Sequence, residues 1–243
     1  MFSVNINNDK YLDTLTSVED SLVSLYEKHL IENSKGGVIL REVDCWQGRA
    51  DLVSAKIYGE YKININQAEL LSNLTYAQII SLLHYNAPRS FNYLVERLAM
   101  TDATIKRAIS ILKRADIIEQ IDKNKFVLCR TFIMPKVEIN AYEAKLHNWK
   151  RAFYQATQYF GFSHYSWVIM PEKYIKPALK NSELFIENGV GLVGLNSKGK
   201  KIVYIKASKH QPRRKAFYLV GVGKIMMKYL LKYDVSHGNF AKR

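Results

Sequence analysis

Long apolar runs are missing from this sequence of 243 residues, which has no stretch of 18 consecutive apolar residues. That absence excludes a transmembrane helix of ordinary length. The first eleven residues, MFSVNINNDKY, lack the basic start and apolar block of a secretory signal. We therefore expect a cytoplasmic protein.

Cysteine is scarce, and the histidines have no pattern. Cys45 and Cys129 are the only cysteines, and both lie in apolar, strand-like runs. We interpret them as reduced core residues. Two cysteines cannot build a structural zinc or iron–sulfur site by themselves, and the six histidines show no metal-ligand spacing. Internal repeats and low-complexity tracts are also absent.

Acidic residues are scarce in the second part of the chain. Residues 1–144 carry 17 Lys and Arg against 18 Asp and Glu, whereas residues 145–243 carry 19 against 4. A one-sided positive surplus favours a polyanionic partner, because neutralised phosphates release counterions. Nucleic acid is the expected partner, with an anionic membrane surface as the alternative.

What the sequence does contain is enough apolar residues for a core, at 48% of the chain.

Three expected strands carry an acid at the end of a core-facing stripe. In VEINAYEAK (137–145), alternation puts Glu143 and Lys145 on the face of the apolar residues. Asp51 in GRADLVSAKI and Glu42 in VILREVDC repeat the pattern. If the strands share a sheet, the four side chains converge; alternatively, each strand simply ends in water.

Two expected helices add polar residues beside their apolar stripes. Glu19 lies in a helix over 9–33, where it faces either the sheet edge or solvent. Gln155 and Tyr159 lie four residues apart in a helix over 147–160, where they serve a nearby site or simply bond to each other. Arg49, two residues before Asp51, is expected to form an ion pair or touch a phosphate.

In chain order these motifs read acidic helix, E…G-R-A-D-L-V, E-A-K and W-x-x-A-x-x-Q-A-x-x-Y. This order resembles the PD-(D/E)XK nuclease superfamily over residues 11–58 and 136–206. Asp51 matches the aspartate of the motif, and 143–145 matches E-x-K. Gln155 and Tyr159 look like the Q-x-x-x-Y element of the RecB-like branch, and Glu19 looks like the acid of the first helix. The long stretch between Asp51 and Glu143 departs from the usual short turn and requires an insertion.

The resemblance implies an α/β (α+β) fold with a restriction-endonuclease-like central mixed sheet flanked by helices. It also implies that Asp51, Glu143 and the carbonyl of Ala144 bind Mg²⁺ or Mn²⁺. Lys145 would orient a water and stabilise charge on the phosphate. The remaining roles are given as follows: Gln155 positions Lys145 or a water, Tyr159 contacts the DNA backbone, and Glu19 and Glu42 help hold a second ion or water.

The stretch from residue 75 to residue 128 reads as three helices and a hairpin. TDATIKRAISILKRADII resembles the third helix and first wing strand of a winged helix-turn-helix domain, inserted into the core. The family places such a helix in a DNA major groove and the wing on the backbone. The expected contacts are Thr104, Lys106, Arg107, Ser110 and Lys113 on the helix, and Lys123 and Lys125 on the wing. Asp102 departs from the pattern because it repels phosphate, and the alternative is a domain that contacts only protein.

The C-terminal part carries a basic run and a glycine pattern. Lys209, Arg213 and Arg214 either line a DNA path or form a solvated loop. The G-x-G-x-x-G at 189–194 precedes a turn and a strand over 201–206, so it predicts a hairpin and not a dinucleotide site.

Together these patterns predict three segments: a first core part (1–60), an inserted winged-helix domain (61–132), and a second core part with a basic C-terminal region (133–243). The expected activity is Mg²⁺-dependent hydrolysis of duplex DNA in the nucleoid, with a homodimer as one way to cut both strands. A catalytically inactive DNA-binding protein on the same fold is the alternative, and an RNA nuclease is a third reading.

Overall fold

The structure is a computed structural model that describes residues 19–33, 37–196 and 199–236. Its contacts divide the chain into two units. The first unit comprises Met1–Lys56 and Ile139–Pro212, and the second comprises Ile57–Glu138 and Arg213–Arg243. Within the described residues, no helix combines the length and the apolar character needed to cross a bilayer.

A six-stranded mixed sheet forms the centre of the first unit. Its strand order is β1-β2-β6-β7-β8-β9. The strands are β1 (Val38–Asp44), β2 (Arg49–Tyr58), β6 (Lys136–Ala144), β7 (Tyr165–Pro171), β8 (Gly191–Leu195) and β9 (Lys201–Ile205). β1 and β2 form an antiparallel hairpin, β6, β7 and β8 are parallel, and β9 returns antiparallel to β8. The expected hairpins at 38–58 and 189–206 are therefore confirmed.

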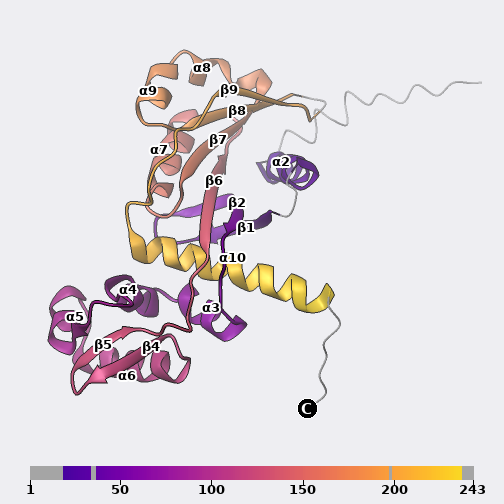
Figure 1. The fold of residues 1–243 in the computed structure, drawn as a ribbon. Helices are drawn as coiled ribbons and strands as arrows, with labels where there is room; N and C mark the ends of the chain where they lie inside the picture. Colours follow the sequence, from indigo (N-terminus) through magenta and orange to yellow (C-terminus); the bar gives the residue numbers. More distant parts are fainter. Residues whose placement is uncertain (1–18, 34–36, 197–198, 237–243) are drawn as a thin grey trace, which may run out of the picture. The chain divides into compact units, whose positions relative to one another are not determined.

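Helices flank both faces of this sheet, as Figure 1 shows. Helix α2 (Glu19–Asn33) buries Leu22 and Tyr26 against alternate strand residues such as Ile169 and Val193. Helix α7 (Trp149–Tyr159) buries its small apolar stripe against the opposite face, where Val168 lies. The alternation of β7 residues between the two cores follows from the strand period of two. The chain thus belongs to the mixed α/β class, as expected.

The segment between β7 and β8 forms three short helical pieces. They are η1 (Glu172–Tyr174), α8 (Lys176–Leu179) and α9 (Ser182–Glu187). Pro177 lacks an N–H and favours the first turn of a helix, so a new helix begins beside it. The expected helix over 9–33 is confirmed from Glu19 onward, and its earlier residues lie outside the described part of the chain.

The second unit contains five helices and a small sheet among its described residues. The helices are α3 (Ile65–Ser72), α4 (Leu74–Leu82), α5 (Phe91–Arg97), α6 (Asp102–Arg114) and α10 (Lys215–Ser236). The antiparallel sheet has the order β3-β5-β4, from β3 (Arg89–Ser90), β4 (Ile118–Asp122) and β5 (Lys125–Leu128). The Thr101 hydroxyl caps α6 by accepting from Thr104 N.

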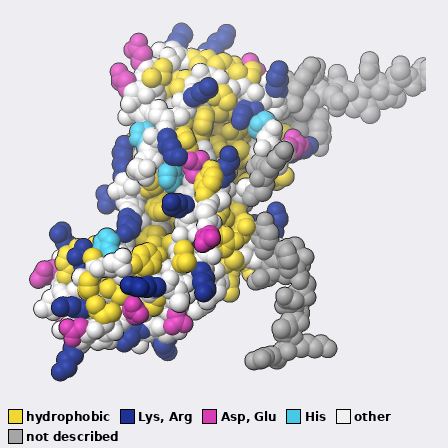
Figure 2. All heavy atoms as spheres, viewed as in Figure 1, with side chains coloured by type: hydrophobic (Ala, Val, Ile, Leu, Met, Phe, Trp, Pro, Cys, Tyr) yellow, Lys and Arg dark blue, Asp and Glu magenta, His cyan; other side chains and the backbone are white. Residues whose placement is uncertain are grey.

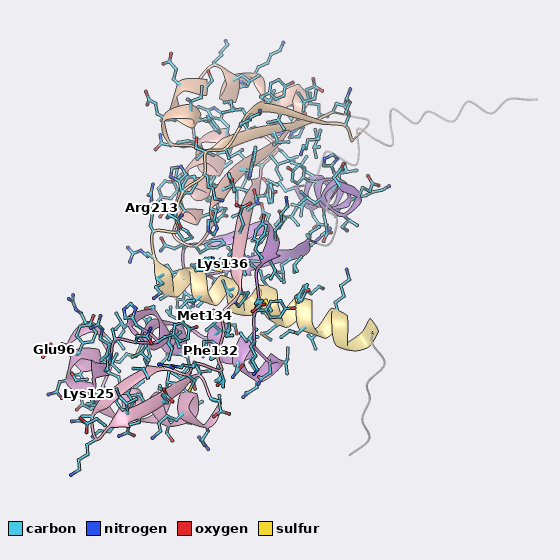
Figure 3. All side chains as sticks on the ribbon, viewed as in Figure 1. Glu96, Lys125, Phe132, Met134, Lys136 and Arg213 are labelled. Carbon is cyan, nitrogen blue, oxygen red and sulfur yellow. The ribbon has the colours of Figure 1, made fainter. Side chains whose placement is uncertain are left out.

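Helix α6 is amphipathic in the expected register. Its four inward residues, Ile105, Ala108, Ile109 and Leu112, are all buried. The β4–β5 hairpin that follows has Lys125 at the start of its returning strand (Figure 3). The helices and hairpin expected between residues 75 and 128 are thus present.

The C-terminal helix α10 clusters with the second unit, whereas the sequence analysis grouped it with the core. It packs against α3 at Gly223, where an added Cβ would lie 2.4 Å from Ser72 N and 2.7 Å from the Ala68 carbonyl oxygen. The Tyr218 hydroxyl also donates to the Val137 carbonyl oxygen at 3.0 Å. This close helix–helix approach, which the apolar pattern alone does not reveal, sets where α10 belongs.

Candidate active site

A polar cavity of about 400 Å³ lies in the first unit. Its lining comprises Glu19, Asp20, Val23, Glu42, Arg49, Asp51, Glu143, Lys145, Arg151 and Gln155. These residues come from α2, β1, β2, the end of β6, and α7. The convergence expected for the acidic strand ends and Lys145 is therefore confirmed.

Glu143 is the most enclosed charged group of the cavity, with 1% of its surface exposed. Tyr159 donates its hydroxyl hydrogen to Glu143 Oε2, and Lys145 Nζ lies 3.1 Å from Oε1. Burial and the neighbouring charge of Asp51 raise the pKa of Glu143 to about 7, although the bonds from Tyr159 and Lys145 favour its ionised form. Glu143 is thus poised between its protonated and ionised forms near neutral pH.

Asp51 reaches the neighbouring strand through a main-chain bond. Its Oδ2 accepts from Ala144 N at 2.7 Å, which ties β2 to the end of β6. Burial raises the pKa of Asp51 overall, while this bond and the charge of Lys145 act in the opposite direction. Two partly desolvated carboxyl groups therefore sit on adjacent strands, and each disfavours ionisation of the other.

The Lys145 ammonium is surrounded by oxygen atoms. Its Nζ lies 3.0 Å from Glu19 Oε2 and 3.1 Å from both Glu143 Oε1 and the Ala144 carbonyl oxygen. An ammonium has three N–H donors, so these oxygens can accept all of them. Burial alone would lower the pKa of Lys145, but the charge of Glu143 and the bond to Glu19 raise it overall. Lys145 is consequently a cation held at the centre of an oxygen cluster.

Tyr159 does not have the position expected of a residue that contacts DNA. Its side chain is fully buried, and its hydroxyl lies 3.0 Å from the Arg49 carbonyl oxygen as well as bonding to Glu143. The expected contact with a DNA backbone is therefore wrong for this conformation, because no surface of Tyr159 reaches solvent. The residue instead orients the Glu143 carboxylate.

Gln155 lies one helical turn before Tyr159 and lines the cavity. Its Oε1 is buried without a hydrogen-bond partner among the described residues. The simple bond between Gln155 and Tyr159, which was the alternative, is replaced by the bonds of Tyr159 to Glu143 and Arg49. A buried amide oxygen without a partner at a cavity wall suits contact with a water or a ligand.

Glu42 and Arg49 form an exposed ion pair at the cavity rim, with Arg49 Nε 2.7 Å from Glu42 Oε2. The pairing expected for Arg49 is confirmed. Glu42 lies between the paired residues Arg41 and Val43 of β1 and has a φ of 53°, which is uncommon for a residue other than glycine. Glu19 and Glu42 are each engaged by a basic residue, Lys145 and Arg49 respectively.

Arg151 lines the cavity and was not predicted from the sequence. It lies in the first turn of α7, and its side chain is exposed. The signal was available, because Arg151, Gln155 and Tyr159 follow one another at intervals of four along one helix face. A guanidinium at this rim can bind a phosphate with two parallel hydrogen bonds.

The residues expected to contact DNA are distributed over both units. Those on α6 and the β4–β5 hairpin are all exposed: Thr104, Lys106, Arg107, Ser110, Lys113, Lys123 and Lys125. Lys113 Nζ donates to Gln120 Oε1 at 2.7 Å, which joins α6 to β4. Lys209 belongs to the first unit, whereas Arg213 and Arg214 belong to the second. Figure 2 shows Lys and Arg side chains spread over the face in view, with Asp and Glu sparser.

No group of three or more His, Cys, Asp and Glu side chains within the described ranges is arranged to hold a metal ion. A cation at this cavity would therefore rely on Asp51, Glu143 and main-chain oxygen. Comparisons of the chain with protein-family models, curated proteins and solved structures give no match.

Proposed function

We propose that this protein is a metal-dependent DNA endonuclease of the PD-(D/E)XK type, which hydrolyses phosphodiester bonds with Mg²⁺ or Mn²⁺. The observation that carries the proposal is the meeting of Asp51, Glu143 and Lys145 in one polar cavity. Asp51 and Glu143 lie 92 positions apart in the sequence, yet Asp51 bonds to the main chain beside Glu143. A protein that only binds DNA has no need of this costly cluster of buried charge.

The arrangement of the first unit supports a restriction-endonuclease-like core. The two carboxylates come from neighbouring strands β2 and β6, and the lysine follows β6 directly. Helix α2 supplies an acid to that lysine, and α7 supplies a tyrosine to the buried glutamate. These elements occur in the chain order of the motif that the sequence resembles, which supports the proposal.

The donor set of the cavity fits a hard divalent cation. Carboxylate and carbonyl oxygens suit Mg²⁺ and Mn²⁺, and Asp51, Glu143 and the Ala144 carbonyl would supply them. The position of Lys145 supports this assignment, because its positively charged ammonium already lies against the oxygens of Glu143 and the Ala144 carbonyl. When bound, such an ion polarises a phosphoryl oxygen and makes a water more acidic.

The side chains of this protein would each have a distinct task in the hydrolysis. A water oxygen joins the phosphorus, and the sugar oxygen leaves and takes up a proton. Because the pKa of Lys145 is raised, Lys145 stays protonated and donates hydrogen bonds to the attacking water or to the phosphate. Gln155 has a free acceptor with which to orient a water, and Arg151 is placed to bind an adjacent phosphate.

Within the same proposal, residues 61–132 form a winged helix-turn-helix domain that holds the chain on duplex DNA. Helix α6 would enter the major groove, and the β4–β5 hairpin would be the wing. The exposed basic side chains of α6 and the hairpin support this role. The net charge of +14 supports a polyanionic partner for the whole chain.

The proposal is tested by cleavage of plasmid DNA with Mg²⁺ or Mn²⁺ and with EDTA. Lys145→Ala should reduce cleavage by at least about 100-fold, a typical loss for one group that stabilises transition-state charge, while DNA binding is retained. Lys180→Ala, directly after α8, is the matched control and should cut normally. Equal cleavage by the Lys145 variant, or no metal-dependent cleavage by the wild type, would contradict the proposal.

The same assay separates the competing functions. A gel shift without cleavage, with either metal, would favour a catalytically inactive DNA-binding protein on this fold. Comparison of duplex DNA, single-stranded DNA and RNA as substrates would detect an RNA nuclease. We expect duplex DNA to be cleaved fastest, since the proposed winged helix reads the DNA major groove.

A further inference from the structure

Two arginines flank the ring of Tyr93, one from strand β3 and one from helix α5. Arg89 Cζ in β3 lies 5.1 Å from the centroid of the Tyr93 ring, and Arg97 Cζ at the end of α5 lies 5.7 Å from the same centroid. We call these three residues the arginine–tyrosine stripe. None of the residues that the proposed function places on DNA belongs to this stripe.

The two guanidinium groups lack an anionic partner. Among the described residues, no carboxylate pairs with Arg89 or Arg97. The Nε of Arg89 is buried and makes no hydrogen bond. Both distances end at one ring centroid, so the two positive charges lie within about 11 Å of each other and repel. A ligand with several negative oxygens would relieve both the repulsion and the unsatisfied donor.

The stripe adjoins the surface that is proposed to bind DNA. Ser90 pairs with Lys125 in the small sheet, and Phe91 N donates to the Asn124 carbonyl oxygen at 2.9 Å. On the other side, Lys106 of α6 lies 5.5 Å from the Phe91 ring centroid. The start of α5 therefore contacts both α6 and the tip of the β4–β5 hairpin.

We infer that the arginine–tyrosine stripe is a clamp for the phosphate backbone of duplex DNA, separate from the base-reading face of α6. The inference rests on the proposed function, because it assumes that the second unit binds DNA. A separation of at most about 11 Å lets the two guanidinium groups reach neighbouring phosphates of one strand, since the axial rise is about 3.4 Å per nucleotide. Stacking on Tyr93 holds the planar forks in place, so less rotamer entropy is lost on binding.

The test is the salt dependence of duplex DNA binding by the full-length protein, measured by fluorescence anisotropy without divalent metal. Each lost phosphate contact should reduce the slope of log K against log salt by about 0.9. We expect a reduction of about 0.9 for Arg97→Ala and about 1.8 for Arg89→Ala/Arg97→Ala. The loss should be similar for unrelated DNA sequences, since phosphates carry no base identity.

Two further variants serve as controls for the loss of charge and for misfolding. Lys176→Ala/Lys180→Ala, at the start of α8 and directly after it, removes the same charge from two exposed lysines spaced four apart, and its slope should stay near that of the wild type. Arg89→Lys/Arg97→Lys keeps the charge and should restore most of the slope, which covers the case in which the double alanine variant misfolds.

The outcomes distinguish this inference from the proposed function. If the wild type binds no duplex DNA at low salt, both are overturned. If the wild type binds and cuts DNA but the arginine variants keep its slope, or if the α8 control loses as much slope, only the clamp is overturned. A slope change seen with duplex RNA and not with duplex DNA would also overturn the assignment to DNA.

Discussion

At the scale of single residues, the burial of Glu143 is the feature with the most consequences. A carboxylate at 1% exposure needs partners that hold its charge, and Tyr159 and Lys145 supply them. The side chain of Tyr159 is fully buried, so it does not contact solvent or a ligand directly. It is a positioning residue that would act through Glu143.

Removal of the Tyr159 hydroxyl should therefore impair catalysis more than it impairs folding. For Tyr159→Phe we expect the Mg²⁺ concentration for half-maximal cleavage to rise and activity to fall by roughly 10- to 100-fold, as for other partners of metal-binding side chains. The measurement is a Mg²⁺ titration of cleavage beside a thermal melt. Tyr154→Phe, on the exposed face of the same helix, is the control, and an equal loss there would refute the positioning role.

The raised pKa of Glu143 also predicts how stability changes with pH. The folded state holds its proton up to a pKa of about 7, while the unfolded side chain ionises near its ordinary value of 4.5. Protons are thus bound preferentially by the folded state between these values, so this group's contribution to stability is lost as pH rises from about 4.5 to 7.

The melting temperature of the metal-free protein should therefore fall as pH rises from 5 to 8. Glu143→Gln cannot titrate, so the melting temperature of the variant relative to wild type should increase across this range. Melts in EDTA at a series of pH values provide the measurement. A constant difference between the two proteins would show that Glu143 does not titrate there.

The sequence could predict the residues of this site but not all of their roles. Alternation within two strands was enough to place Asp51, Glu143 and Lys145 on core-facing stripes, because the side-chain period of a strand is fixed. The i,i+4 spacing placed Tyr159 beside Gln155, but spacing does not tell which residue a hydroxyl reaches in the folded chain. Arg151 was missed because a basic residue in a first helical turn is usually a solvated one.

At the scale of elements, local patterns located most helices and strands, whereas long-range packing decided where they belong. Helix α6 was predictable because its apolar stripe and Thr101 cap agree. The assignment of α10 differed because its contact with α3 depends on Gly223, which in a sequence reads only as a weak helix former.

Gly223 gives the prediction at this scale. Alanine favours a helix by about 1 kcal/mol over glycine, but the Cβ would meet backbone atoms of α3 at 2.4–2.7 Å. Overpacking of this kind typically costs about 1–3 kcal/mol, so Gly223→Ala should be net neutral to destabilising and Gly223→Val clearly destabilising. Urea unfolding measures both. Lys228→Ala, an exposed site on the same helix, is the control, and a stabilised Gly223→Val variant would contradict the packing.

At the scale of the whole molecule, the positive surplus and the acidic residues of the cavity come from different segments of the sequence. The positive surplus lies after residue 144, while the acids of the cavity come from residues 19–143. Their partial separation lets the chain attract a polyanion without filling the cavity with cations, since only Arg49, Lys145 and Arg151 line it.

The number of cavities per chain predicts how the proposed nuclease would cut duplex DNA. The described residues contain one cavity with the Asp51, Glu143 and Lys145 set, and one such site hydrolyses one strand at a time. At limiting protein, supercoiled plasmid should therefore become open circles first and linear DNA only later, as followed on agarose gels. Linear product without open circles would instead require two chains acting together on one duplex. Sedimentation of the protein with a short duplex distinguishes these cases, because a nicking monomer forms a complex with one chain and a double-strand cutter forms one with two.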